Sequence, residues 1–296
     1  QAAARDLAQK LTATGLNKGA SVAILQPNGR EAVISLFGVL YGGFRATVIN
    51  LMAGDEAIGY ALNHCKARLA LVGEAQSEMF NRVRPSRLEL LPGNSTEGQT
   101  ELHPLQADDD ALLMYTSGTT GRPKGVVHSH ASLLAGGWTP TVAHELTQQD
   151  CGYCVLPIYH INGLCVTIMG ALISGGSLAI AEKFSASKFW SHCDFAQATW
   201  FSVVPTIISH LLHSDNKPLD ETSNRIRFGR SASSALSPDV QNAFEKRFGV
   251  PIVETMGLTE TAAQILSNPL PPGTRKIGSP GKAYGNEACI LSKELK

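Results

Sequence analysis

The sequence has few cysteines, few charged residues and no excess of either sign of charge. Its 296 residues include six cysteines, which is too few for a disulfide scaffold. Lys and Arg number 25, and Asp and Glu also number 25, so the formal net charge is zero. This balance argues against a polybasic protein that binds nucleic acid by neutralising phosphates. Charged residues make up only 17% and hydrophobic residues 43% of the chain, which excludes an extended disordered protein and indicates a sizeable core.

Long uninterrupted hydrophobic runs are also lacking. Residues 151–181 contain no charged side chain, but Pro157, His160, Asn162 and the pair Gly175-Gly176 break this stretch. A helix that spans a bilayer needs about 20 continuous apolar residues. We therefore expect this stretch to be part of a buried core and expect no membrane span.

Signals for metal binding or for secretion are similarly sparse. Cys151 and Cys154 form a CxxC pair, but no second pair follows to complete a zinc site, so we expect buried or idle thiols rather than zinc or redox use. The first residues, QAAARDLAQKL, have an early acidic residue and no apolar core, unlike a signal peptide. A cytoplasmic location is the expectation.

Strand-length apolar runs alternate with helix-length segments along most of the chain. Strands are expected at residues 21–25, 46–50, 69–72 and 111–115, and near 177–181, 198–202, 226–229 and 250–253. Helices are expected at residues 1–14, 31–41 and 55–64, from about 129, and near 161–174, 185–193, 204–213 and 237–247. This alternation is typical of βαβ units and predicts an α/β fold with mostly parallel sheets. Residues 73–108 are expected to form a polar surface connection.

The most informative segment is YTSGTTGRPKG at residues 115–125. Three glycines, four hydroxyl side chains and Lys124 follow a predicted strand. Such a loop can direct backbone N–H groups, hydroxyls and one ammonium group toward a polyphosphate. It is not the loop of P-loop NTPases, because Pro123 stands where that motif has Gly, and Gly125 follows the lysine.

This segment resembles the phosphate-loop signature of the adenylate-forming superfamily, which includes acyl-CoA synthetases, adenylation domains of peptide synthetases and luciferases. Three further motifs occur in the order found in that family. They are LPIYHING at residues 156–163, RSASSAL at residues 230–236 and ETMGLTE at residues 254–260. The resemblance covers nearly the whole chain.

For ATP, the resemblance implies a distributed binding site. The β- and γ-phosphates would be held by the phosphate loop, which comprises Thr116, Ser117, Gly118, Thr119, Thr120, Gly121 and Lys124. Thr259 would contact the α-phosphate, and Glu260 would hold Mg²⁺. The adenine would lie between two short segments, Ser233, Ser234 and Ala235 on one side and Glu254, Thr255 and Met256 on the other.

The adenine segments depart from the family's usual sequence. Residues 232–235 read Ala-Ser-Ser-Ala where Gly-Ala-Ala-Pro is usual, and Met256 replaces the usual Tyr. A thioether can pack against a purine face, so we expect ATP binding to be retained.

For the acid, the resemblance implies a pocket near His160. His160 occupies the family's pocket-gating position, although a lone His beside an apolar helix is more often a packed core residue. The remaining expected pocket residues are Phe201, Ser231, Ala232 and Gly257. We assign catalytic roles to Lys124, Thr259, Glu260 and His160.

The family's activity joins a carboxylate to the α-phosphate of ATP with release of pyrophosphate, then passes the acyl group to coenzyme A. We expect such an acyl-CoA synthetase, acting on a small or medium carboxylate that can be aromatic or a dicarboxylate. An adenylation domain that loads a carrier protein, a luciferase-like oxygenase and a nucleotide-binding fragment without turnover remain alternatives. The oligomeric state is left open.

The resemblance also implies a domain organisation. Residues 31–145 would form a first α/β subdomain with the phosphate loop. Residues 1–30 and 146–265 would form a second with the acyl and adenine sites, and residues 266–296 an incomplete β-rich part. The family's C-terminal lid, which carries a catalytic lysine, has no counterpart up to residue 296, so we expect the isolated chain to be impaired.

Overall fold

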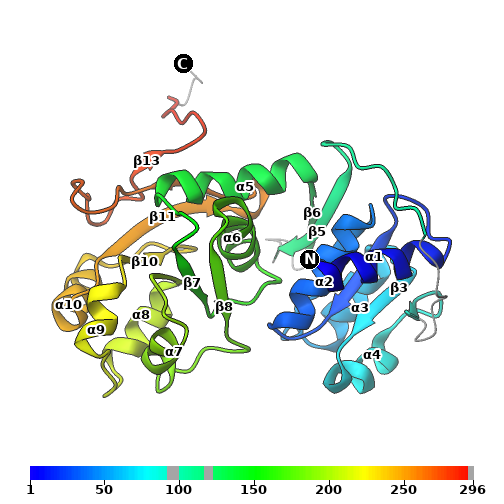
Figure 1. Ribbon diagram of the computed structural model, residues 1–296, viewed down its shortest axis with the longest axis horizontal. Coiled ribbons are helices and arrows are strands. Elements are labelled where there is room, and N and C mark those ends of the chain that lie inside the picture. The colour runs from blue at the N-terminus through cyan, green and yellow to red at the C-terminus, as the bar shows by residue number, and fades with distance from the viewer. Residues whose placement is uncertain (92–99, 117–122, 293–296) are drawn as a thin grey trace. The chain divides into compact units, whose positions relative to one another are not determined.

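The computed structural model describes residues 1–91, 100–116 and 123–292. It confirms the α/β fold with two sheets in which parallel pairing predominates. The chain divides into two compact units (Figure 1). The first unit contains Gln1–Leu134, Pro157–Leu164 and Ile180–Lys183, and the second contains Ala135–Leu156, Cys165–Ala179 and Phe184–Lys296.

The first unit is built on a six-stranded sheet with the order β4-β3-β1-β2-β5-β6. Its strands are β1 Ser21–Leu25, β2 Arg45–Val48, β3 Leu69–Val72, β4 Glu89–Leu90, β5 Asp110–Thr116 and β6 Lys124–Ser129. The pairs are parallel except for the antiparallel hairpin of β5 and β6. All five residues of β1 are buried, as expected for an apolar strand in a sheet covered on both faces.

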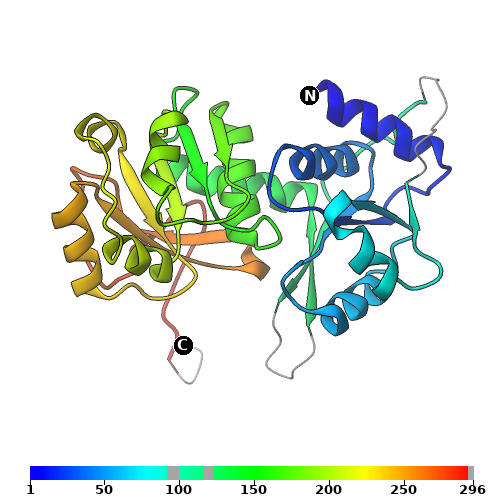
Figure 2. The ribbon, with the colours of Figure 1, turned by 90° about the horizontal axis from the view of Figure 1, so that it is seen from below.

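Helices cover both faces of this sheet, and the strand order explains why. The chain passes from β1 to β2 through one helix, then returns past β1 to β3 through another. Because parallel crossovers are right-handed, reversing direction places these helices on opposite faces. Figure 2 shows α1 and α2 on one face and α3 and α4 on the other. The helices are α1 Ala2–Ala13, α2 Arg30–Tyr41, α3 Asp55–His64 and α4 Ser77–Val83, with a short 3₁₀ turn at Glu74–Gln76.

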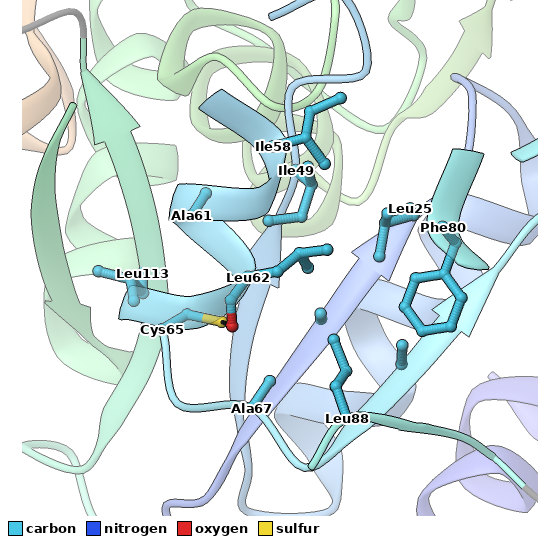
Figure 3. Close-up of a cluster of buried hydrophobic side chains, with 12 residues drawn as sticks. Leu25, Ile49, Ile58, Ala61, Leu62, Cys65, Ala67, Phe80, Leu88 and Leu113 are labelled. Carbon is cyan, nitrogen blue, oxygen red and sulfur yellow. Dashed lines mark hydrogen bonds between the residues drawn. The ribbon is translucent and has the colours of Figure 1, made fainter. Parts of the chain in front are cut away.

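Between this sheet and α3 and α4 lies a cluster of buried apolar side chains (Figure 3). Leu25 and Ile49 come from β1 and the end of β2, Leu62 from α3 and Phe80 from α4. Phe80 and Leu88 are fully buried, so residues 73–108 are not wholly a surface connection as predicted. The sequence pattern did not reveal α4 because it is seven residues long and buries one side chain, Phe80.

The second unit contains a seven-stranded sheet with the order β13-β12-β11-β10-β9-β7-β8. Its strands are β7 Cys151–Cys154, β8 Ser177–Ile180, β9 Trp200–Val203, β10 Phe228–Ser231, β11 Ile252–Leu258, β12 Ala263–Ser267 and β13 Lys282–Ala283. Strands β7, β9, β10 and β11 pair in parallel, whereas β12 and β13 are antiparallel. Residues 266–296, expected to form an incomplete β-rich part, contain the end of β12 and strand β13.

Aromatic rings fill the core on one face of this second sheet. Phe201 of β9 packs 5.1 Å from Phe189, 6.0 Å from Trp190 and 6.4 Å from Phe244 between ring centroids. The remaining helical elements are α5 His130–Ala143, a π-helix at Asn162–Met169, α6 Gly170–Ser174, α7 Phe189–Phe195, α8 Pro205–Leu212, α9 Asp220–Arg225, α10 Pro238–Phe248 and a 3₁₀ turn at Thr259–Thr261.

One expectation about chain organisation is corrected. Residues 1–30 lie in the first unit and not with residues 146–265, because β1 pairs with both β2 and β3. The helix expected from about residue 129 begins at His130, directly after strand β6. Cys151 and Cys154 are three residues apart in β7, so their side chains point to opposite faces of the sheet.

A buried carboxylate ties together the beginnings of several strands in the second unit. Asp150, which is 5% exposed, accepts hydrogen bonds from Thr199 Oγ1 at 2.7 Å, Arg227 Nη1 at 2.7 Å and the Thr147 N–H at 2.9 Å. Burial acts to raise the pKa of Asp150, but the hydrogen bonds from Thr199, Thr147 and Arg227 outweigh it and hold that pKa below its usual value. Asp150 immediately precedes β7, and its partners precede β9 and β10.

We predict that Asp150→Ala lowers the free energy of unfolding by about 2–4 kcal/mol at pH 7, because buried donors lose their acceptor. The folded-state pKa lies below the unfolded value of about 3.9, so this stabilisation is present above pH ~4 and disappears as the pH falls through the folded-state pKa. Urea unfolding at several pH values measures both effects. Asp6→Ala, at an exposed ion pair with Lys10, is the control and should cost under about 0.5 kcal/mol. Equal losses in the two variants would contradict the role of Asp150.

Candidate functional site

The ends of the predicted phosphate loop lie on the β5–β6 hairpin of the first unit. Thr116, the last residue of β5, is the register partner of Lys124, the first residue of β6. Lys124 is exposed and Thr116 is partly buried. The expected phosphate-binding residues Ser117, Gly118, Thr119, Thr120 and Gly121 lie outside the described residues. The hairpin therefore brings the two ends of the loop, Thr116 and Lys124, next to each other.

A tyrosine anchors the base of this hairpin to α3. The Tyr115 hydroxyl lies 2.8 Å from His64 Nδ1 and 3.3 Å from the carbonyl oxygen of Ala61. Burial raises the pKa of Tyr115 above its usual value, so the hydroxyl stays protonated at neutral pH and remains a donor. The sequence does not indicate this role of His64, because no local pattern relates α3 to a residue of β5.

His160 lies in a loop of the first unit that is fixed to the loop after β1. The N–H of Ile158 donates to Asn28 Oδ1 at 3.0 Å, and Asn28 Nδ2 donates to the carbonyl oxygen of Ala181 at 3.3 Å. The His160 N–H closes a turn by donating to the carbonyl oxygen of Pro157 at 3.1 Å. His160 itself is exposed, which distinguishes it from a packed core histidine.

In the second unit, the carboxyl ends of three parallel strands bring two other motifs side by side. Ser231 at the end of β10 is the register partner of Val203 in β9 and of Glu254 in β11. Ser231 and Ala232 are buried, and the expected adenine segment Ser233–Ala235 that follows is exposed. Ligands of open parallel sheets bind at such strand ends. The structure therefore places RSASSAL beside ETMGLTE.

Glu254 fastens the adenine segment to β11. Its Oε1 accepts a hydrogen bond from the Leu236 N–H at 3.0 Å, and its carbonyl oxygen accepts from the Asn268 N–H at 3.0 Å. Glu254 is 5% exposed. Within the described ranges, Glu254 Oε2 and the Ser231 hydroxyl are buried and have no hydrogen-bond partner. Two register-paired side chains thus leave polar atoms available to a ligand.

The rest of ETMGLTE follows β11 into a tight turn. Thr255 is buried and donates to the carbonyl oxygen of Ser231 at 3.3 Å, whereas Met256 is 40% exposed. A Cβ atom on Gly257 would lie 1.6 Å from the carbonyl oxygen of Ala263, so only glycine fits between β11 and β12. The need for glycine at position 257 therefore follows from backbone packing and does not require a contact with the substrate.

Thr259 and Glu260 lie on the 3₁₀ turn Thr259–Thr261, where Thr259 is half-buried and the Glu260 carboxylate is exposed. The hydroxyl of Thr261 stabilises this turn by accepting from the Leu258 N–H at 3.1 Å. In the described ranges no group of three or more His, Cys, Asp or Glu side chains could hold a metal ion. A single exposed carboxylate still fits Mg²⁺, which commonly binds one or two carboxylates together with phosphate oxygens.

Phe201, expected in the acid pocket, is fully buried in the aromatic core described above. Its ring packs against residues of α7 and α10.

The sequence profile of the AMP-binding enzymes matches residues 1–296. The chain belongs to the AMP-binding enzyme family. The resemblance found from the motifs is thereby confirmed. None of the helices in the described parts of this AMP-binding enzyme is long and apolar enough to cross a membrane.

Its relatives include acid–CoA ligases. The sulfoacetate–CoA ligase of Cupriavidus necator is 40% identical over 305 residues, which cover 98% of this chain and 59% of the relative. The oxalate–CoA ligase of Arabidopsis thaliana is 32% identical over 303 residues, which cover 95% of this chain and 58% of the relative. The ATP-bound structure of MatB from Rhodopseudomonas palustris matches with a TM-score of 0.84 and 28% identity, covering 96% of this chain and 58% of that one. This AMP-binding chain thus spans about three fifths of the length of these relatives.

We predict that Glu254→Ala lowers the free energy of unfolding by about 1–3 kcal/mol, because the buried N–H of Leu236 loses its acceptor. Glu254→Gln is the matched control: it keeps an oxygen for this hydrogen bond and should retain most of the stability. Urea unfolding compares the two variants. If Glu254→Ala is as stable as Glu254→Gln, the hydrogen bond does not fasten the adenine segment.

Proposed function

We propose that the whole protein is an AMP-forming acid–CoA ligase. It would join a carboxylic acid to AMP, release pyrophosphate and transfer the acyl group to the thiol of coenzyme A. The observation that carries this proposal is the 40% identity to sulfoacetate–CoA ligase across 98% of the chain. The positions of the motif residues at strand ends and turns support it.

Phosphate binding is assigned to the β5–β6 hairpin and to the turn after β11. Lys124 would neutralise charge on the β- and γ-phosphates, while the loop between Thr116 and Lys124 would supply N–H groups and hydroxyls. Thr259 would donate to the α-phosphate, and Glu260 would hold Mg²⁺. The ion, when bound, would offset the charge of the phosphate oxygens. The ATP-bound structure of the similar MatB supports ATP as the nucleotide.

Adenine recognition is assigned to Glu254 and its neighbours. The available Glu254 Oε2 can accept a hydrogen bond from the exocyclic amine of adenine, whereas it would repel the O6 of guanine. Met256 is exposed next to it and can pack on the purine face. Ser233, Ser234 and Ala235 would lie along the other side of the ring.

The chemistry needs positioning more than a side-chain nucleophile. The substrate's own carboxylate attacks the α-phosphorus, and pyrophosphate leaves. The thiol then attacks the acyl carbon, and AMP leaves. His160 would border the acid near its reacting carboxylate, and Ala232 and the backbone of Ser231 would line the pocket.

We further propose that the acid is short and carries a second acidic group. The sulfoacetate and oxalate named for two relatives both have this property. The same names favour coenzyme A over a carrier protein as the thiol acceptor.

The decisive experiment is ATP–pyrophosphate exchange with a panel of acids. It uses a chain of the relatives' full length that carries this sequence, with sulfoacetate, oxalate, acetate and benzoate as acids. We expect exchange with at least one short acid that has two acidic groups, and thioester formation with coenzyme A. Absence of exchange with every acid would overturn the proposed activity and favour nucleotide binding without turnover. Thioester on a carrier protein alone would favour the loading domain.

Two substitutions test the site in the same assay. Lys124→Ala should raise the KM for ATP roughly 10–100-fold, because a charge-assisted phosphate contact is lost. Glu260→Ala should reduce Mg²⁺-dependent exchange by about 100-fold or more. The exposed residues Lys217 and Glu56 supply matched controls, Lys217→Ala and Glu56→Ala, which should retain exchange. Unchanged exchange in both site variants would remove these assignments.

A further inference from the structure

A buried polar cluster in the second unit has no role in the function proposed so far. It consists of Arg230, Ser202, Gln264 and His144, and we call it the Arg230 cluster. Arg230 is 1% exposed, which is rare for arginine. Its Nε donates to Gln264 Oε1 at 2.9 Å, and its Nη1 donates to Ser202 Oγ at 3.2 Å. His144 Nε2 lies 3.1 Å from the same Gln264 oxygen.

The hydrogen bonds of the Arg230 cluster join one cation to neutral side chains. Burial, and secondarily the charge of Arg230, lowers the pKa of His144 to about 3, so this ring is neutral at neutral pH. Burial lowers the pKa of Arg230 to about 9, which still leaves the guanidinium positive. The four side chains together carry a single positive charge.

Gln264 presents a donor that these hydrogen bonds do not use. Because a guanidinium only donates, the atom of Gln264 facing Arg230 must be the oxygen, which fixes the orientation of the amide. The Nε2 group then points elsewhere. Within the described part of the chain it is buried and has no hydrogen-bond partner. A buried donor left unsatisfied costs about 1–3 kcal/mol, which a ligand acceptor would offset.

The Arg230 cluster adjoins residues assigned to the site. Arg230 immediately precedes Ser231, and Gln264 is the register partner of Gly257. Since side chains alternate along a strand, Arg230 points to the sheet face opposite that of Ser231 and Glu254. The cluster is therefore separate from the atoms assigned to adenine.

We propose that the Arg230 cluster binds the second acidic group of the acid substrate. Oxygens of a carboxylate or sulfonate would accept from the guanidinium of Arg230 and from Gln264 Nε2, because these two groups can donate to different oxygens of one anion. This assignment rests on the proposed acid–CoA ligase activity and adds the residues that select the acid. A purely structural polar network is the competing explanation.

Pairs of acids that are alike except for the second charge distinguish substrate binding by the Arg230 cluster from a purely structural role. Sulfoacetate is compared with methylsulfonylacetate, and malonate with its monoamide, so each pair differs in the second charge. The measured quantity is the ratio of kcat/KM within a pair, obtained by pyrophosphate exchange with the full-length chain. The wild-type ratio should exceed about 10, the value of one charge-assisted hydrogen bond. The sulfonate and carboxylate pairs show which anion the cluster prefers.

Two variants test whether the Arg230 cluster causes the preference for acids with a second charge. Arg230→Met should lower the ratio about 10–100-fold, because the positive charge is lost. Gln264→Glu keeps an oxygen toward Arg230 and His144 but replaces the unused N–H group with a negatively charged oxygen that pairs with Arg230. This variant should remain folded, judged by its Tm, and should also lose the preference. Lys217→Ala is the control and should keep the wild-type ratio.

The outcomes have distinct meanings. A wild-type enzyme that activates acids without preferring the second charge would overturn this inference and leave the ligase activity intact. A preference that persists in Arg230→Met and folded Gln264→Glu would also overturn it and favour the structural network. Absence of exchange with every acid would instead overturn the activity itself.

Discussion

The parallel pairing of β9, β10 and β11 is the constraint on which the second unit's candidate site depends. It aligns Val203, Ser231 and Glu254 in one register, so the segments following three separate strands begin at the same edge of the sheet. Motifs more than twenty residues apart in the sequence thereby become neighbours. The Glu254 carboxylate then fastens the segment after β10, and the close contact of Gly257 with Ala263 forces the chain into the turn that carries Thr259 and Glu260.

The same geometry would allow a chain of zero net charge to bind the polyanionic ligands proposed for it. The proposed contacts use single cations at particular positions rather than a basic surface. Lys124 lies at the start of β6, and the buried Arg230 donates hydrogen bonds to the neutral side chains of Gln264 and Ser202. A buried charge interacts more strongly with a ligand than an exposed one, because less water screens it. Removing a charge from water also costs free energy, which hydrogen bonds to the surrounding side chains must offset.

The fold could be predicted largely because buried parallel strands have an unmistakable composition. Strands β1 and β3 match their predicted bounds because each is a short, mostly apolar run. Strand β6 was missed because its sequence, KGVVHS, has an exposed lysine and glycine at its start and is held by pairing with β5. The phosphate, metal and adenine motifs are local in sequence, so the sequence alone could predict them. No such signal indicated the role proposed for Arg230, because its cluster joins β9, β10, β12 and the end of α5 through tertiary contacts alone.

The central claim is that the acid's own oxygen becomes bonded to the α-phosphorus of ATP. Transfer of ¹⁸O from a labelled carboxylate tests this most directly. The full-length protein is incubated with ATP, coenzyme A and a short two-acid substrate labelled in its reacting carboxylate, and the products are analysed by mass spectrometry. If an acyl-adenylate forms, the thiol displaces AMP together with the bridging oxygen, so each AMP gains one ¹⁸O atom. Unlabelled AMP, or label in inorganic phosphate with ADP as the other product, would contradict the account.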